Sequence, residues 1–132
     1  MPAIEPMDVF ERMLRDFDAA RTVAQGLVSP NPEDDADIKM AITGFSYYCP
    51  TEDWGRSHYS LIRARCDSEL SNRALEMEGA AGFRSFACLA LGALLGLYAS
   101  GQIDDVAFSL GDAQLPGFMY AYLPKIKQST VA

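Results

Sequence analysis

Histidine and tryptophan each occur only once in this chain, as His58 and Trp54, and cysteine occurs only three times. With a single imidazole, any histidine-based catalysis must run through His58. The thiols of Cys49, Cys66 and Cys88 form no C-x-x-C pair and no zinc-ligand spacing. These absences argue against a zinc site, and the odd cysteine count predicts reduced thiols in a cytoplasmic protein.

Motifs that bind phosphate or metal are missing as well. The sequence has no glycine-rich nucleotide loop and no G-x-S-x-G elbow of the serine hydrolases. The acidic run from Glu33 to Asp37 lacks the loop glycine and the final bidentate glutamate of an EF-hand. We therefore predict no metal and no cofactor, and the sequence favours a protein that is not an enzyme.

Long hydrophobic runs are also absent. The longest uninterrupted one, residues 86–99, has fourteen residues, whereas about 20 are needed to span a bilayer. The first residues carry neither the basic region nor the apolar region of an export signal. Both observations predict a cytoplasmic protein with no membrane contact.

Basic residues are few, and the acidic excess is unevenly placed. The chain holds 11 Lys and Arg against 18 Asp and Glu, a net charge of −7. Residues 1–55 carry eleven acids and four bases, and the remainder is balanced. A negative field repels phosphate backbones and attracts basic surfaces. We expect no direct nucleic-acid binding, and a basic protein is the favoured partner.

The 132 residues suit one domain, 1–132, with a single hydrophobic core. Apolar residues recur at steps of three and four over 7–27, 32–48 and 57–77, which is typical of amphipathic helices. Residues 83–98 are apolar on all sides and predict a central helix. A short element at 103–110, a loop at 111–117 and a short terminal segment follow. The predicted fold is an all-α bundle of about four major helices around 83–98, plus short C-terminal helices.

Two alternatives stay open. Ile38, Met40 and Ile42 also alternate at period two, so an α+β fold with a small antiparallel sheet from residues 38–65 would fit. Gly92 and Gly96 form a small-x-x-x-small pair, which favours a close helix crossing. That crossing would lie within the chain or between two copies in a homodimer.

The segment from Tyr47 to Tyr59 is the strongest candidate for a functional site. It gathers Tyr, Trp and Arg, the residue types that dominate binding hot spots. Acidic residues before it would steer a basic partner. The candidate binding residues are Glu33, Asp34, Asp35, Asp37, Tyr47, Tyr48, Glu52, Asp53, Trp54, Arg56, His58 and Tyr59.

The sequence thus predicts a small acidic binding protein that acts by occluding a basic protein partner. An inhibitor, an immunity-type protein or a regulatory subunit would fit this description. The alternative is a ligand-binding or catalytic pocket at the same segment, built from His58, Cys49 and Arg56. In that case Cys49 and His58 would form a nucleophile pair oriented by Asp53.

Overall fold

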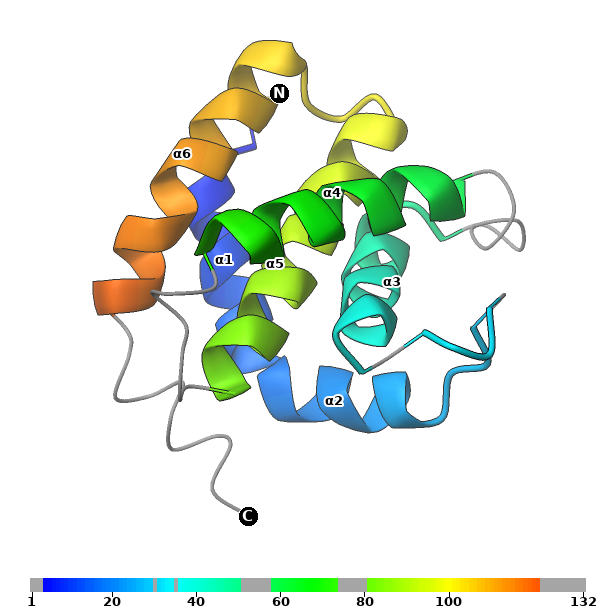
Figure 1. Cartoon of the computed structure of the whole chain (residues 1–132). Coiled ribbons are helices and arrows are strands. Elements are labelled where there is room, and N and C mark those ends of the chain that lie inside the picture. Colours follow the sequence, from blue (N-terminus) through cyan, green and yellow to red (C-terminus); the bar gives the residue numbers. More distant parts are fainter. Residues whose placement is uncertain (1–3, 30, 35, 51–57, 74–80, 122–132) are drawn as a thin grey trace.

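The computed structural model describes residues 4–29, 31–34, 36–50, 58–73 and 81–121, and these residues form six α-helices (Figure 1). The fold is all-α, as the sequence predicted. The helices are α1 (Pro6–Arg15), α2 (Phe17–Gln25), α3 (Ala36–Tyr48), α4 (Tyr59–Arg73), α5 (Ala81–Ala99) and α6 (Asp105–Ala121).

Helix α5 is the centre of the core, in agreement with the apolar run in the sequence. Every residue from 86 to 97 is buried. The helix ends in a Schellman motif, in which Gly101 has a φ of 75° and the amide of Gln102 donates to the carbonyl of Leu97 at 2.9 Å. No helix in the described part of the chain is long and apolar enough to cross a membrane.

Helices α3 and α5 cross with their backbones in contact. A Cβ built on Gly92 would overlap the carbonyl of Ala41, and one on Gly96 would overlap that of Phe45. Gly44 meets the carbonyl of Leu89 in the same way. The Gly92/Gly96 face is therefore used inside the chain. Helix α3 covers this face within one chain, and the homodimer stays a prediction.

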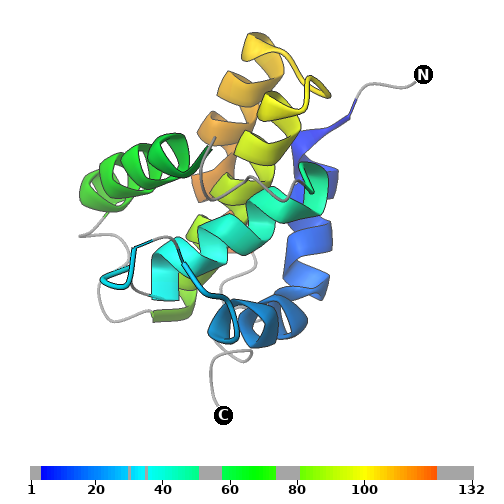
Figure 2. The same ribbon diagram turned by 90° about the vertical axis from the view of Figure 1, so that its right-hand side faces the viewer.

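The predicted helix over 7–27 is two helices, broken at Asp16. The backbone of Asp16 (φ −94°, ψ 7°) leaves the helical conformation, while its amide still donates to the carbonyl of Arg12 at 3.0 Å. The break turns α2 so that it crosses beneath α3, whereas α1 packs against α5 and α6 (Figures 1 and 2). Neither Gly nor Pro marks this break, so the apolar pattern alone did not show it.

Helix α3 begins at Ala36, four residues later than predicted. Before it, the side chain of Asn31 accepts a hydrogen bond from the amide of Glu33 at 3.0 Å, and its carbonyl accepts one from the amide of Asp34 at 3.0 Å. Asn31 thus starts a separate turn. The sheet alternative for residues 38–65 is wrong over the described residues, because 38–48 and 59–65 are helical.

The C-terminal part differs most from the prediction. Residues 111–117, expected as a loop, belong to α6, which continues through Gly111 and Pro116. The carboxylate of Asp104 caps this helix by accepting a hydrogen bond from the amide of Ala107 at 2.9 Å. Gly111 lets α6 pack closely against α5, since a Cβ on Gly111 would lie 2.9 Å from the side chain of Leu94. Packing thus offsets the cost of a proline inside the helix.

Candidate functional site

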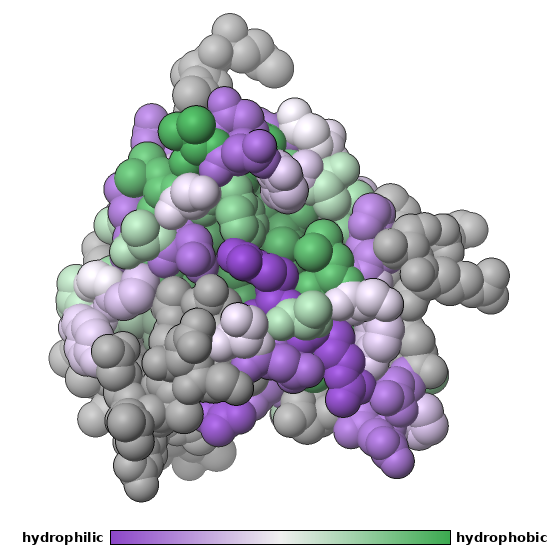
Figure 3. Space-filling model, turned by 45° about the horizontal axis from the view of Figure 1, so that its top comes forward, coloured by the Kyte–Doolittle hydropathy of each residue, from purple (hydrophilic) through white to green (hydrophobic). Residues whose placement is uncertain are grey.

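A groove opens between α4 and α6, with the end of α5 as its floor. It encloses about 520 Å³. Figure 3 views this side of the molecule and shows apolar residues gathered at its centre, with hydrophilic residues between and around them. The lining residues are Leu61, Arg65, Leu95, Tyr98, Asp105, Phe108, Ser109, Asp112 and Ala113.

Helical spacing explains which side chains face the groove. On α4, Ile62 and Cys66 are fully buried against the core. Leu61 and Arg65, four residues apart, share the neighbouring face and line the groove. On α6, Asp105, Ser109 and Asp112 are four and three residues apart, so they also share one helix face and line the groove.

Arg65 is held across the groove by two contacts with α6. Its guanidinium lies 5.0 Å from the ring centroid of Phe108, and its Nη2 lies 4.0 Å from Oδ2 of Asp112. Its Nε is buried and makes no hydrogen bond to any described residue. The charge of Arg65 is therefore directed at α6 rather than outward.

The far end of the groove is formed by Tyr98 and Asp105. The ring of Tyr98 packs on that of Phe108 with centroids 5.3 Å apart, and its hydroxyl donates to the carboxylate of Asp105. This hydrogen bond and the charge of Asp105 raise the pKa of Tyr98 above its ordinary value. The hydrogen bond from Tyr98 thus holds the carboxylate of Asp105 at the edge of the groove.

The outer side of α6 continues the groove as an exposed apolar stripe, which we call the α6 stripe. Its residues are Val106, Leu110, Ala113, Gly117 and Tyr120, spaced four, three, four and three apart. Val106 is 77% exposed, Leu110 46% and Tyr120 52%. This spacing places all five on one helix face, which is typical of a helix–helix seam. The α6 stripe contains no charged residue.

The groove and the α6 stripe together present apolar contact surface with charged groups beside it. The described lining residues include no imidazole or thiol, and both carboxylates are held by neighbours. No group of three or more His, Cys, Asp or Glu among the described residues could hold a metal ion. An apolar floor with acidic positions at its rim would accept an apolar segment that carries positive charge.

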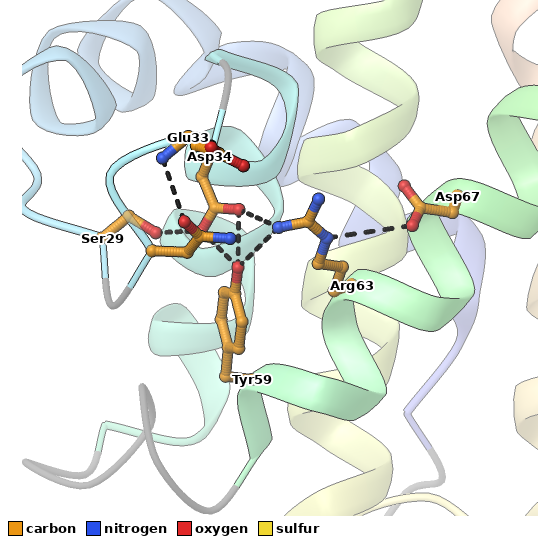
Figure 4. Close-up of polar contacts among 7 residues, drawn as sticks. Ser29, Glu33, Asp34, Tyr59, Arg63 and Asp67 are labelled. Atoms are coloured by element: carbon orange, nitrogen blue, oxygen red, sulfur yellow. Dashed lines mark hydrogen bonds and ion pairs between the residues drawn. The ribbon is translucent and has the colours of Figure 1, made fainter.

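Asp34, predicted as part of an exposed acidic surface, lies inside the protein. Its side chain is 0% exposed and accepts hydrogen bonds from Tyr59, Arg63 and Ser29 (Figure 4). The hydroxyl of Tyr59 and Nη1 of Arg63 each lie 2.5 Å from Oδ1 of Asp34. Burial and the bond to Asp34 raise the pKa of Tyr59. Asp34 and Tyr59 are thus in contact. Their hydrogen bond joins the turn before α3 to the start of α4 and does not form part of an exposed acidic surface.

The other predicted acids and tyrosines of α3 do not form one surface. Glu33 is exposed, whereas Asp37 is ion-paired with Arg84 at 3.2 Å. Tyr47 and Tyr48 lie at the opposite end of α3, half-buried, with the guanidinium of Arg12 at 5.2 and 5.4 Å from their ring centroids. The length of α3 separates these tyrosines from the acids.

Of the residues predicted for a catalytic pocket, the structure describes Cys49 and His58. The ring of His58 packs on that of Phe45 at 5.0 Å, and Cys49 is buried. Cys49, Cys66 and Cys88 form no disulfide, and all three are buried. Several predicted site residues lie outside the described residues, namely Asp35, Glu52, Asp53, Trp54 and Arg56.

Sequence reasoning missed the groove and the α6 stripe because α6 was not predicted as one helix. The four-three spacing from Val106 to Tyr120 is visible in the sequence. Gly111, Pro116 and Gly117 concealed it, because they are typical of a loop. Comparison of the chain with protein-family models, with curated proteins and with solved structures finds no match.

Proposed function

We propose that the protein is a small binding protein, an inhibitor or regulatory subunit, that occludes a basic protein partner. The observation that carries this proposal is the α6 stripe, which runs beside a groove of about 520 Å³. An exposed apolar stripe beside a groove is typical of interaction sites. The proposal keeps the function expected from the sequence and places the contact on α4 and α6.

Charge indicates what kind of partner would bind. Helix α6 carries Asp105 and Asp112 and no basic residue. Arg65 of α4, which lines the groove, is already engaged by Asp112 and Phe108. A second copy of this face would bring like charges together, which disfavours self-association there. A basic partner would instead be attracted by these acids and by the net charge of −7.

The shape of the α6 stripe favours a helical partner segment. Its four-three spacing matches the seam between two packed helices, and the apolar anchors Val106 and Leu110 would enter the opposing groove. A Cβ at Gly117 would meet nothing within 4 Å. The partner backbone can therefore come close at this position.

The test is affinity capture with purified tagged protein and three matched forms. Leu110→Glu places a charge in the α6 stripe, and Val23→Glu places the same charge on α2, where Val23 is 58% exposed. We expect a basic protein to be retained by the wild type and by Val23→Glu and lost from Leu110→Glu. A buried apolar anchor is worth about 2 kcal/mol or more at a hot spot, which is enough for this loss.

Trp54→Ala is the third form, and it tests the anchor predicted from the sequence. Loss of the partner from Trp54→Ala alone would move the interface to the Tyr47–Tyr59 segment. Equal retention by all forms, or retention of acidic proteins only, would contradict the proposal. Circular dichroism and light scattering of each form would check that it is folded and would report any homodimer.

A further inference from the structure

A second cavity lies on another part of the molecule, between α2, α3 and α5. It encloses about 320 Å³, at the lower end of the range for small-molecule sites. Figures 1 and 2 show α2 crossing beneath the beginnings of α3 and α5, which is where this cavity opens. Its position differs from that of the groove, and it does not depend on the function proposed above.

The polar lining of this cavity is cationic, although the protein as a whole is acidic. Arg21 from α2 and Lys39 from α3 line it together with Gln25 and Ser85. Its described lining residues include no carboxylate. All four side chains can donate hydrogen bonds, and two of them carry positive charge. Such a set of donors is suited to an anion.

The acid in the first turn of α3, next to the cavity, is already paired with a base. Asp37, in the first turn of α3, is ion-paired with Arg84 at 3.2 Å, so its charge is largely compensated. Ala36, the first residue of α3, also lines the cavity. The positive end of the α3 dipole therefore adds to the charges of Arg21 and Lys39.

The remaining walls are apolar. Ala24 and Met40 are buried, with 3% and 2% of their surface exposed, and both line the cavity. A ligand with an anionic group and a small apolar part would contact both kinds of wall. Lys39 supplies a compact point charge and Arg21 a planar set of donors, a combination that fits a phosphate group.

From this geometry we infer that the cavity between α2, α3 and α5 binds a small phosphate-bearing molecule. Arg21 and Lys39 contact the phosphate group, Ser85 and Gln25 donate to its remaining oxygens, and Ala24 and Met40 contact the organic part. Such a ligand would join three helices and stabilise the folded protein by mass action.

The experiment is a titration of the full chain with inorganic phosphate and pyrophosphate, followed by amide NMR shifts and by thermal unfolding. Sodium chloride at matched ionic strength controls for screening, and acetate tests whether a carboxylate suffices. We expect saturable shifts that centre on Lys39 and Ser85, together with a rise in the unfolding temperature. Acetate should produce neither.

Lys39→Gln and Arg21→Gln should each weaken phosphate binding about tenfold, since each removes one charge-assisted contact. Arg15→Gln is the matched control, because Arg15 is an exposed base on α1 outside the cavity. Equal weakening by Arg15→Gln, or no saturable shift in the wild type, would overturn the inference. A response to acetate equal to that of phosphate would overturn the assignment of the phosphate group.

Discussion

At the scale of the residue, Asp34 shows how position changes the role of an acidic side chain. In the sequence it belongs to a run of acids that indicates a solvated turn. In the structure its carboxylate is enclosed by donors from residues 25 and 29 positions later, Tyr59 and Arg63. A buried carboxylate is tolerated only when its oxygens are hydrogen-bonded. Asp34 therefore fixes where the start of α4 lies against the turn before α3.

Replacing Asp34 by Ala should lower the free energy of unfolding by about 3 kcal/mol, because three partly buried donors lose the buried carboxylate that they share. Glu33→Ala is the matched control in the same turn. Glu33 is exposed, so its loss should change the free energy of unfolding by less than about 0.5 kcal/mol. Urea unfolding followed by circular dichroism measures both values. An equal effect of the two substitutions would show that the buried network does not stabilise the fold.

At the scale of the element, the sequence predicted the helices that its apolar pattern marks continuously. Helix α5 and most of α3 and α4 follow from this pattern. The break at Asp16 did not, because residues on both sides continue the stripe and only tertiary packing turns the chain there. Helix α6 was missed because Gly111 and Pro116 indicate a loop in the sequence. In the structure, contacts with α1 and α5 hold a helix through both residues.

The position of the candidate site could not be predicted from the sequence, for the same reason. Composition gave the net acidity of the chain, but the expected acids and anchors were residues 33–37 and 47–59 rather than those of α4 and α6. The groove depends on how α4, α5 and α6 meet, and no local pattern encodes that arrangement. The convergence of Asp34 with Tyr59 and Arg63 likewise joins residues far apart in the sequence.

Replacing either of two helical glycines by alanine should change the free energy of unfolding, in opposite directions at the two positions. Gly92→Ala should lower the free energy of unfolding by about 2 kcal/mol or more, because the new methyl group would overlap the backbone of Ala41. Gly117→Ala should raise it by about 0.5–1 kcal/mol, since the position is open and alanine is the better helix former. Denaturant unfolding measures both. A neutral Gly92→Ala would contradict the close crossing of α3 and α5.

At the scale of the whole molecule, helix α5 links two chemically different surfaces. Ser85, near its beginning, lines the cationic cavity, and Leu95 and Tyr98, near its end, line the acidic groove. At a rise of 1.5 Å per residue these positions are roughly 15–20 Å apart along the helix axis. One buried helix thus carries a groove with two carboxylates near one end and a cavity with two bases near the other, and keeps their charges apart.

The stability of the whole molecule should fall at alkaline pH because of its tyrosines. Burial raises the pKa of Tyr47, burial and the bond to Asp34 raise that of Tyr59, and the bond to Asp105 raises that of Tyr98. Above the ordinary value of 10.0, the unfolded chain loses these protons before the folded one does. The unfolded state then binds fewer protons, so the free energy of unfolding decreases as pH rises.

Tyr59→Phe isolates one of these contributions. Groups that do not contact Tyr59 titrate equally in the wild type and the variant, so the difference between their free energies of unfolding reports Tyr59 and its contacts with Asp34 and Arg63. Below pH 10 this difference should be constant, with the wild type more stable because Tyr59 donates to Asp34. It should shrink as pH rises through the raised pKa of Tyr59, where the folded protein also loses the proton. Urea unfolding on both sides of pH 10 measures the difference. If it stays constant, the Tyr59 hydroxyl has the same pKa in both states and its bond to the buried carboxylate does not stabilise the fold.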